Sequence, residues 1–248
     1  MTDLVRAELL KWRTTRSLYT TVLGVVLIVA LSVSASIATA GQNGAAALGT
    51  TEGLRSAFGA AANGGFLVMI MGIITSAGEY RHNTITSAVL ITPRRSPLIA
   101  AKAAAMAIMG AAMAIVACAV TLAIALPWLA AKGIHPALLS VDVGLVLAGS
   151  AAVITLFGLI GVGIGSMVRN QVAAIVGALA WLMVVEQLLV KLLPTVGRFL
   201  AFGASGSLIG AVDADLLPAG AAAVLLVAYA AAFTAGGVYV TARRDIVA

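Results

Sequence analysis

The sequence predicts an all-α integral membrane protein whose helices cross the lipid bilayer six times. Of the 248 residues, 62% are hydrophobic and only 10% are charged, whereas soluble domains average about 45–50% and about 25%. A soluble fold of this length cannot bury so much apolar surface, because the buried fraction rises only slowly with chain length. The charges stand in short clusters between apolar runs, as in loops of membrane proteins. We therefore assign the net charge of +6 to membrane topology and not to nucleic-acid binding.

Six apolar runs are long enough to cross about 30 Å of hydrocarbon, which takes about 20 helical residues. They are continuously apolar and do not alternate with a period of two, which argues against a β-barrel. Small residues are frequent in them, as in helices that pack closely in lipid. Together they predict one domain over residues 1–248, with spans at 18–40, 57–78, 98–126, 143–168, 171–190 and 218–241.

Glycines in the fourth run form a face of small residues. Gly158, Gly161 and Gly165 are spaced three and four residues apart, so they share one side of a helix. Such a face is a candidate for close helix packing, either within the chain or between two copies of it. The Gly-rich stretch has no βαβ context, so it does not predict a dinucleotide site.

Lys and Arg residues predict the orientation of the spans. With the amino terminus in the cytoplasm, eleven of them lie in cytoplasmic segments and four in outer segments. The positive-inside rule therefore places both termini in the cytoplasm, and an even number of spans agrees. Ala38-Thr39-Ala40 has the form of a signal-peptidase site, but the first apolar run exceeds the 7–15 residues typical of a signal peptide. We expect that run to be an uncleaved span.

The segment before the first span, residues 1–17, predicts an interfacial amphipathic helix. Val5, Leu9 and Trp12 fall at i, i+4 and i+7 and so share one face, whereas Lys11 lies elsewhere on the helix. A basic amphipathic helix with a tryptophan tends to lie in the membrane interface. Leu9, Lys11 and Trp12 are its candidate functional residues, and a simple positively charged anchor is the alternative.

The segment between the second and third runs, residues 79–97, predicts a cytoplasmic coupling loop that contains a short helix. Ile85, Val89 and Leu90 can share a face of that helix, and Pro93 ends it. Charges stand on both sides of this apolar face, which suits a docking element for another protein. A connector whose charges only set topology is the alternative. The flanking charged residues are Glu79, Arg81, Arg94 and Arg95.

This loop resembles the first cytoplasmic loop of ATP-binding-cassette type 2 permeases, in which GEYRxGTI is followed by TPRR and a lysine. Residues 78–85 read GEYRHNTI, residues 92–95 read TPRR, and Lys102 follows. Asn83 stands in place of the family's glycine, and asparagine also tolerates a left-handed backbone. The opening AELLKWRTTRS resembles the N-terminal helix of the same family.

The resemblance implies a transmembrane exporter permease of a bacterial cytoplasmic (inner) membrane, with a role such as multidrug resistance. Two permeases, identical or homologous, would face each other around a central path and move a hydrophobic or amphipathic drug, lipid or peptide outward. Two copies of a separate ATPase would hold ATP and Mg and contact the N-terminal helix and the loop. The implied ATPase-coupling residues are Glu79, Tyr80, Arg81, Thr84, Ile85, Arg94 and Arg95.

From the sequence we expect the chain itself to be no enzyme and to bind no cofactor. It contains no G-x-x-x-x-G-K-[ST] phosphate loop. Gly203-Ala204-Ser205-Gly206 has the form of an intramembrane serine protease motif, but both histidines, His82 and His135, precede it, whereas the mechanism needs a later histidine as base. Two histidines and Cys118 do not make a metal site. An ATP-independent channel or an accessory membrane assembly subunit is the alternative function.

The end of the fifth run and the segment after it suggest a structure on the outer face. Residues 191–217 contain proline, glycines and aspartates and predict a broken or re-entrant helix, which must be covered by protein or water. Glu186 is an intramembrane carboxylate, and such groups usually face protein or water. We expect it either to line the substrate path and select cations, or to pair with Lys191 or Arg198.

Overall fold

The computed structural model describes residues 2–15, 17–42, 44–81, 95–134, 141–168, 170–211 and 216–243. Within them, six helical segments are long and apolar enough to cross a membrane. The predicted all-α fold with six candidate spans is therefore confirmed. The segments are Ser17–Thr39, Thr51–Gly78, Pro97–Ala131, Asp142–Met167, Gln171–Leu192 and Ala219–Arg243.

Two of the spans are interrupted by a tighter or a wider helical turn. The second span consists of α3, a 3₁₀ segment η1 and α4, and the fifth consists of α8, a π-helical segment η2 and α9. In chain order the described elements are α1 (Thr2–Thr14), α2 (Ser17–Thr39), α3 (Thr51–Gly59), η1 (Ala60–Asn63), α4 (Gly64–Arg81), α6 (Arg95–Ala131), α7 (Val141–Met167), α8 (Gln171–Ala180), η2 (Trp181–Glu186), α9 (Gln187–Leu192), α10 (Pro194–Gly197), α11 (Ala201–Leu208) and α12 (Ala219–Arg243).

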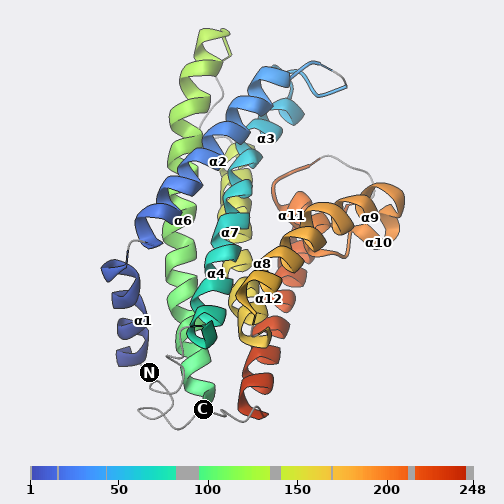
Figure 1. The fold of residues 1–248 in the computed structure, drawn as a ribbon. Coiled ribbons are helices and arrows are strands. Elements are labelled where there is room, and N and C mark those ends of the chain that lie inside the picture. Colours follow the sequence, from blue (N-terminus) through green and yellow to red (C-terminus); the bar gives the residue numbers. More distant parts are fainter. Residues whose placement is uncertain are drawn as a thin grey trace.

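Helix α7 is the centre of the bundle, where it packs against α4, α6 and α12. Helix α2 lies along α6, and α1 lies beside the start of α6 (Figure 1). The fifth span leans away from the bundle, and α11 turns back to pack on α12 and α7 (Figure 1). Helix α1 and the end of α12 lie at the same end of the bundle, so the even number of spans and the positions of the two ends agree.

Glycines make the close packing of α7 possible. A Cβ atom built on Gly161 would overlap the carbonyl of Met69 in α4, and one on Gly72 of α4 would overlap the carbonyl of Gly158. A Cβ atom on Gly163 would overlap the backbone of Phe233 in α12. The small-residue face predicted in the fourth run therefore packs within the chain, against α4.

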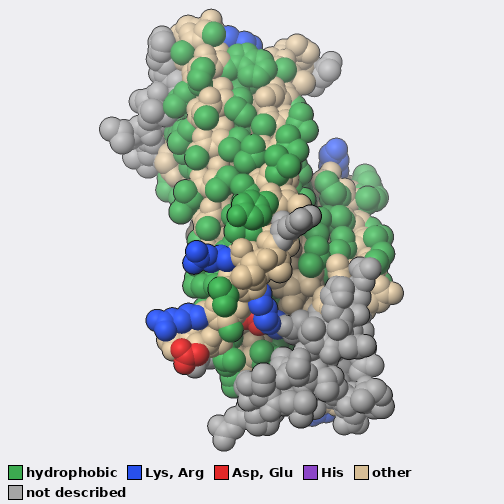
Figure 2. All heavy atoms as spheres, turned by 60° about the vertical axis from the view of Figure 1, so that its left-hand side comes forward, with side chains coloured by type: hydrophobic (Ala, Val, Ile, Leu, Met, Phe, Trp, Pro, Cys, Tyr) green, Lys and Arg blue, Asp and Glu red, His purple; other side chains and the backbone are tan. Residues whose placement is uncertain are grey.

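The outer surface of the bundle is apolar, as expected for helices in contact with lipid. In α2, Leu23, Leu27 and Leu31 are 54–70% exposed, while Val25 and Val29 on the other side of the helix are fully buried. Figure 2 shows hydrophobic side chains over the upper half of one face, with charged side chains below them and a few more at the top and right edges. In water this exposed stripe would be unfavourable, whereas in lipid it needs no cover.

Two span boundaries differ from the prediction. Residues 51–56, predicted as outer loop, are the first turns of α3, because the Thr50 hydroxyl caps this helix by accepting the Gly53 N–H at 3.1 Å. Helix α6 continues to Ala131 although Pro127 lies inside it. A proline weakens but does not always end a helix, and Leu129, which is fully buried in the turn after it, holds this end of α6 in the bundle.

The structure describes the other predicted segments only in part. Residues 2–14 form a helix, but its position at a membrane interface remains a prediction. Of the loop 79–97, residues 82–94 lie outside the described residues. Residues 191–217 contain the end of α9 and the short helices α10 and α11, and their position relative to the bilayer also remains a prediction.

Candidate functional site

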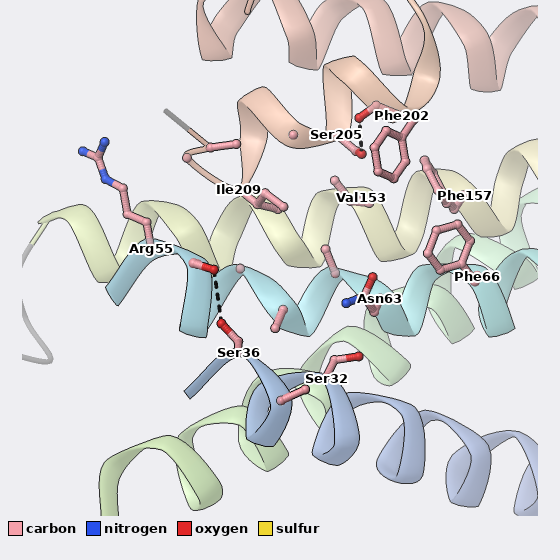
Figure 3. Close-up of a pocket in the computed structure, with 18 of the residues that line it drawn as sticks. Ser32, Ser36, Arg55, Asn63, Phe66, Val153, Phe157, Phe202, Ser205 and Ile209 are labelled. Atoms are coloured by element: carbon pink, nitrogen blue, oxygen red, sulfur yellow. Dashed lines mark hydrogen bonds between the residues drawn. The ribbon is translucent and has the colours of Figure 1, made fainter. Parts of the chain in front are cut away.

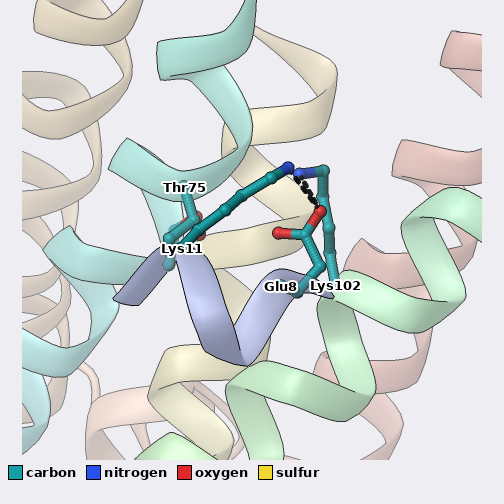
Figure 4. Close-up of polar contacts among 5 residues, drawn as sticks. Glu8, Lys11, Thr75 and Lys102 are labelled. Atoms are coloured by element: carbon teal, nitrogen blue, oxygen red, sulfur yellow. Dashed lines mark hydrogen bonds and ion pairs between the residues drawn. The ribbon is translucent and has the colours of Figure 1, made fainter. Parts of the chain in front are cut away.

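A buried ion pair fixes α1 to the start of α6. The Glu8 Oε1 atom accepts hydrogen bonds from Lys102 Nζ at 3.1 Å and from Lys11 Nζ at 2.8 Å (Figure 4). Glu8 and Lys102 are each only 5% exposed, whereas the Lys11 side chain is about half exposed, at 53%. Lys102 therefore contributes a charge inside the protein, where a carboxylate partner is needed.

The position of Glu8 follows from the helical period of α1. Leu4, Glu8 and Trp12 are four residues apart, so they follow one another along one face. That face packs on α6, which buries Trp12 to 5% exposure. Glu8 thus lies in the middle of an otherwise apolar face, a position at which a carboxylate is unfavourable unless it is paired.

The interfacial-helix prediction identified part of this arrangement. Trp12 is buried and Leu9 is partly buried, as the predicted apolar face requires. Lys11 is a partner of Glu8 and not an isolated surface charge. Glu8 itself was missed, although an acidic residue between apolar positions four residues before and after it was the available signal.

The predicted coupling residues are only partly described. Glu79, Tyr80 and Arg81 belong to the last turn of α4, and Arg95 begins α6. For these four residues the structure describes the backbone and not the side chains. The other three, Thr84, Ile85 and Arg94, lie outside the described residues altogether. Both described ends of the loop lie at the same end of the bundle as α1 (Figure 1). The structure thus brings the N-terminal helix and the ends of the loop together.

Glu186 joins the fifth span to α11. Its Oε1 atom accepts the Trp181 Nε1–H at 2.7 Å, and its Oε2 atom accepts the backbone N–H of Phe202 at 2.6 Å. Phe202 is the second residue of α11, so the carboxylate caps a helix that has no side-chain cap of its own. Trp181 and Glu186 are five residues apart, and the π-helical segment between them brings both to one side.

The expected pairing of Glu186 with Lys191 or Arg198 is therefore wrong. Both carboxylate oxygens are used by Trp181 and Phe202, and Glu186 is only 4% exposed. The guanidinium of Arg198 instead lies 4.9 Å from the ring centroid of Phe199. A role of Glu186 in a substrate path remains a prediction.

Helix α11 borders two cavities. One, of about 430 Å³, is almost entirely apolar and is bordered by Trp181, Glu186 and Phe233. The other, of about 630 Å³, lies between α2, the α3–η1 segment, α7 and α11 (Figure 3). Phe157 of α7 borders both cavities. The second cavity is the more polar, since serines and Asn63 are part of its wall.

No family model matches the chain. The search of curated proteins also found no match. The family resemblance of the loop is therefore the basis of a proposal and not of an assignment.

Replacing Glu186 by Ala tests its role in holding α11. The change removes a helix cap and leaves the Trp181 N–H without its acceptor, which should cost about 1–3 kcal/mol. We expect hydrogen–deuterium exchange in Ala201–Leu208 to become at least about tenfold faster, since 1.4 kcal/mol is a factor of ten. The exposed Glu52→Ala variant is the control and should exchange as the wild type does. If exchange is unchanged while export of cations falls, the carboxylate belongs to a substrate path.

Proposed function

We propose that this chain is the permease subunit of an ATP-binding-cassette exporter of type 2. It lies in a bacterial cytoplasmic membrane with both termini in the cytoplasm, and a second permease, identical or homologous, completes the transport path. Two copies of a separate ATPase subunit bind ATP and Mg and drive the outward movement of a hydrophobic or amphipathic substrate. The loop sequence GEYRHNTI and the TPRR that follows are the sequence support for this proposal.

The structural observation that supports it is the buried Glu8–Lys102 pair. Lys102 lies in the second turn of α6, directly after the loop, and Glu8 lies in the middle of α1. Because two buried charges hold these helices together, a protein bound at the loop or at α1 would move both. Such a coupled pair of helices is what a permease needs to receive work from an ATPase.

Helix α6 can carry that movement across the membrane. It runs without interruption for 37 residues from Arg95 to Ala131, which corresponds to about 55 Å at 1.5 Å per residue. It also packs on the central helix α7. A tilt imposed at its start is therefore transmitted to the opposite end of the bundle, as alternating access requires.

Purification of the full chain from its native membrane, followed by measurement of ATP turnover, tests the proposal. We expect an ATPase subunit to co-purify in a fixed ratio and to hydrolyse ATP in the complex. Glu79→Ala and Arg81→Ala should lower turnover about tenfold or more, because each leaves a partly desolvated partner charge unpaired. Ile85→Pro should reduce ATPase retention itself, since proline breaks a short helix.

Lys132→Ala is the matched control, because Lys132 is an exposed cation directly after the far end of α6. It should leave both retention and turnover at the wild-type level. If the chain purifies without an ATPase, or if all three loop variants keep wild-type retention and turnover, the loop is only a connector. An ATP-independent channel or accessory subunit would then be the better account.

A further inference from the structure

We infer that the 630 Å³ cavity between α2, α3–η1, α7 and α11 binds an uncharged amphipathic small molecule. The molecule has an aromatic or other apolar end, and hydrogen-bonding groups along its other part. This inference rests on the proposed function, because it names the class of substrate that the proposed permease would move. Binding at the cavity needs neither ATP nor the ATPase, so it is tested separately.

The size and place of the cavity suit a ligand. Its volume of about 630 Å³ is within the range of about 300–1,000 Å³ found for small-molecule sites. It lies where the 3₁₀ segment η1 interrupts the second span, and Ala60, Ala62 and Asn63 of that segment form part of its wall. Interruptions of this kind are frequent at functional positions.

Three aromatic rings form the apolar end of the cavity. Phe66 of α4 and Phe157 of α7 meet edge to face, with ring centroids 6.1 Å apart and an interplanar angle of 68°. Phe202 of α11 lies at the same end of the cavity (Figure 3). Aromatic rings favour an apolar or aromatic group, which packs against their faces and edges.

The polar wall has two side chains that form no hydrogen bond with the part of the protein that the structure describes. The Asn63 amide and the Ser32 hydroxyl border the cavity (Figure 3), and neither has a hydrogen-bond partner among the described residues. Both side chains are only partly buried and within reach of water, so a ligand gains affinity here when its own donors and acceptors replace their hydrogen bonds to water. Asn63 offers both a donor and an acceptor, and Ser32 offers a hydroxyl that can act as either.

The other hydroxyls of the wall are already used by the protein. Ser36 and Ser56 hydrogen-bond to each other at 3.1 Å, which ties α2 to α3. The Ser205 hydroxyl donates to the Phe202 carbonyl at 2.6 Å. Asn63 and Ser32 are therefore the positions at which the wall can recognise a ligand.

The charges of the lining favour an uncharged ligand. Glu52 and Arg55 are the charged residues of the lining, and Arg55 lies at the end of the cavity away from the phenylalanines (Figure 3). The Arg55 guanidinium already pairs with Asp142 at 2.7 Å. Glu52 lies one turn before Arg55 in α3, so neither charged residue is near the rings. A charged ligand at the rings would lose its hydration without gaining a counter-charge there, which is unfavourable.

Binding of radiolabelled chloramphenicol to the full chain in lipid nanodiscs tests this inference. The probe is uncharged and has a nitrophenyl end, two hydroxyls and an amide. Equilibrium dialysis against empty nanodiscs, without ATP, should show one saturable site per chain. Asn63→Leu should weaken the affinity about tenfold, and Ser32→Val should weaken it severalfold, since each removes one hydrogen bond to the ligand.

Thr155→Val is the matched control, because Thr155 lies on α7 near Phe157 but does not border the cavity. It should bind the probe as the wild type does, and all three variants should unfold at the wild-type temperature. Binding no greater than to empty nanodiscs overturns the inference. Wild-type affinity for the probe in both Asn63→Leu and Ser32→Val overturns it as well. Displacement of the probe by the cation tetraphenylphosphonium at similar concentration also overturns it. Co-purification of an ATPase with the same chain tests the proposed function separately, so a failure of probe binding does not by itself contradict that function.

Discussion

Replacing Glu8 by Ala should lower the free energy of unfolding by about 3–5 kcal/mol, because it breaks a buried ion pair by removing one of its two charges. Lys102 is 5% exposed and donates to Glu8 at 3.1 Å, so it would stay inside the protein after the carboxylate is removed. Lys102→Ala should have an effect of similar size. The measurement is unfolding by sodium dodecyl sulfate in mixed micelles, monitored by circular dichroism.

The double variant shows whether the two residues act together. Glu8→Leu with Lys102→Leu removes both charges and keeps apolar volume, so it should be much more stable than either single alanine variant. If the losses of the two single variants simply add, the pair does not couple α1 to α6.

A second pair on α1 provides the control. Asp3 and Arg6 are 3.9 Å apart, and their side chains are 91% and 82% exposed. Exposed pairs of this kind contribute little to stability, so Asp3→Ala should unfold as the wild type does. An equal loss of stability in Asp3→Ala and Glu8→Ala would contradict the structural importance of burial at Glu8.

Replacing Gly161 by Val should prevent the close packing of α7 on α4. The new Cβ atom would overlap the Met69 carbonyl, which is backbone and cannot turn aside. The two helices must separate, and overpacking in a core costs about 1–3 kcal/mol and occasionally more. We expect a large loss of monodisperse protein and a lower unfolding temperature in what remains.

Gly144→Val is the matched control in the same helix. A Cβ atom at Gly144 would meet nothing within 4 Å, and valine is no worse than glycine for helix formation. This variant should keep the wild-type yield and unfolding temperature. Equal yields for the Gly144 and Gly161 variants would contradict the packing of α4 on α7.

The sequence predicted the spans well, because long apolar runs are a strong signal and need no knowledge of their neighbours. The ends of the spans were predicted less well. The α3 helix begins at a Thr50 cap within a segment that has polar residues, and α6 passes through Pro127 because buried Leu129 holds its end in place. Both depend on contacts that a hydropathy pattern does not contain.

Partners of buried charges could not be predicted from the sequence. The period of α1 shows which residues share a face, but Lys102 lies 94 residues after Glu8. The partners of Glu186 were predicted wrongly, because proximity along the chain favoured Lys191 and Arg198. A π-helical turn and the return of α11 bring Trp181 and Phe202 to the carboxylate instead. The sequence indicated a broken segment at 191–217 but not where it would pack, and the π-helical turn has no reliable sequence signal.

Topology is the point on which the proposed function depends, since α1 and the loop can meet an ATPase only on the side where ATP is present. Single cysteines at Gln42, His135 and Thr92, in a Cys118→Ala background, can be labelled in intact cells with a membrane-impermeant maleimide. We predict labelling at Gln42 and His135 from outside, and at Thr92 only after the membrane is opened. Labelling of Thr92 in intact cells, with Gln42 and His135 protected, would contradict the proposed orientation and the proposed permease function with it.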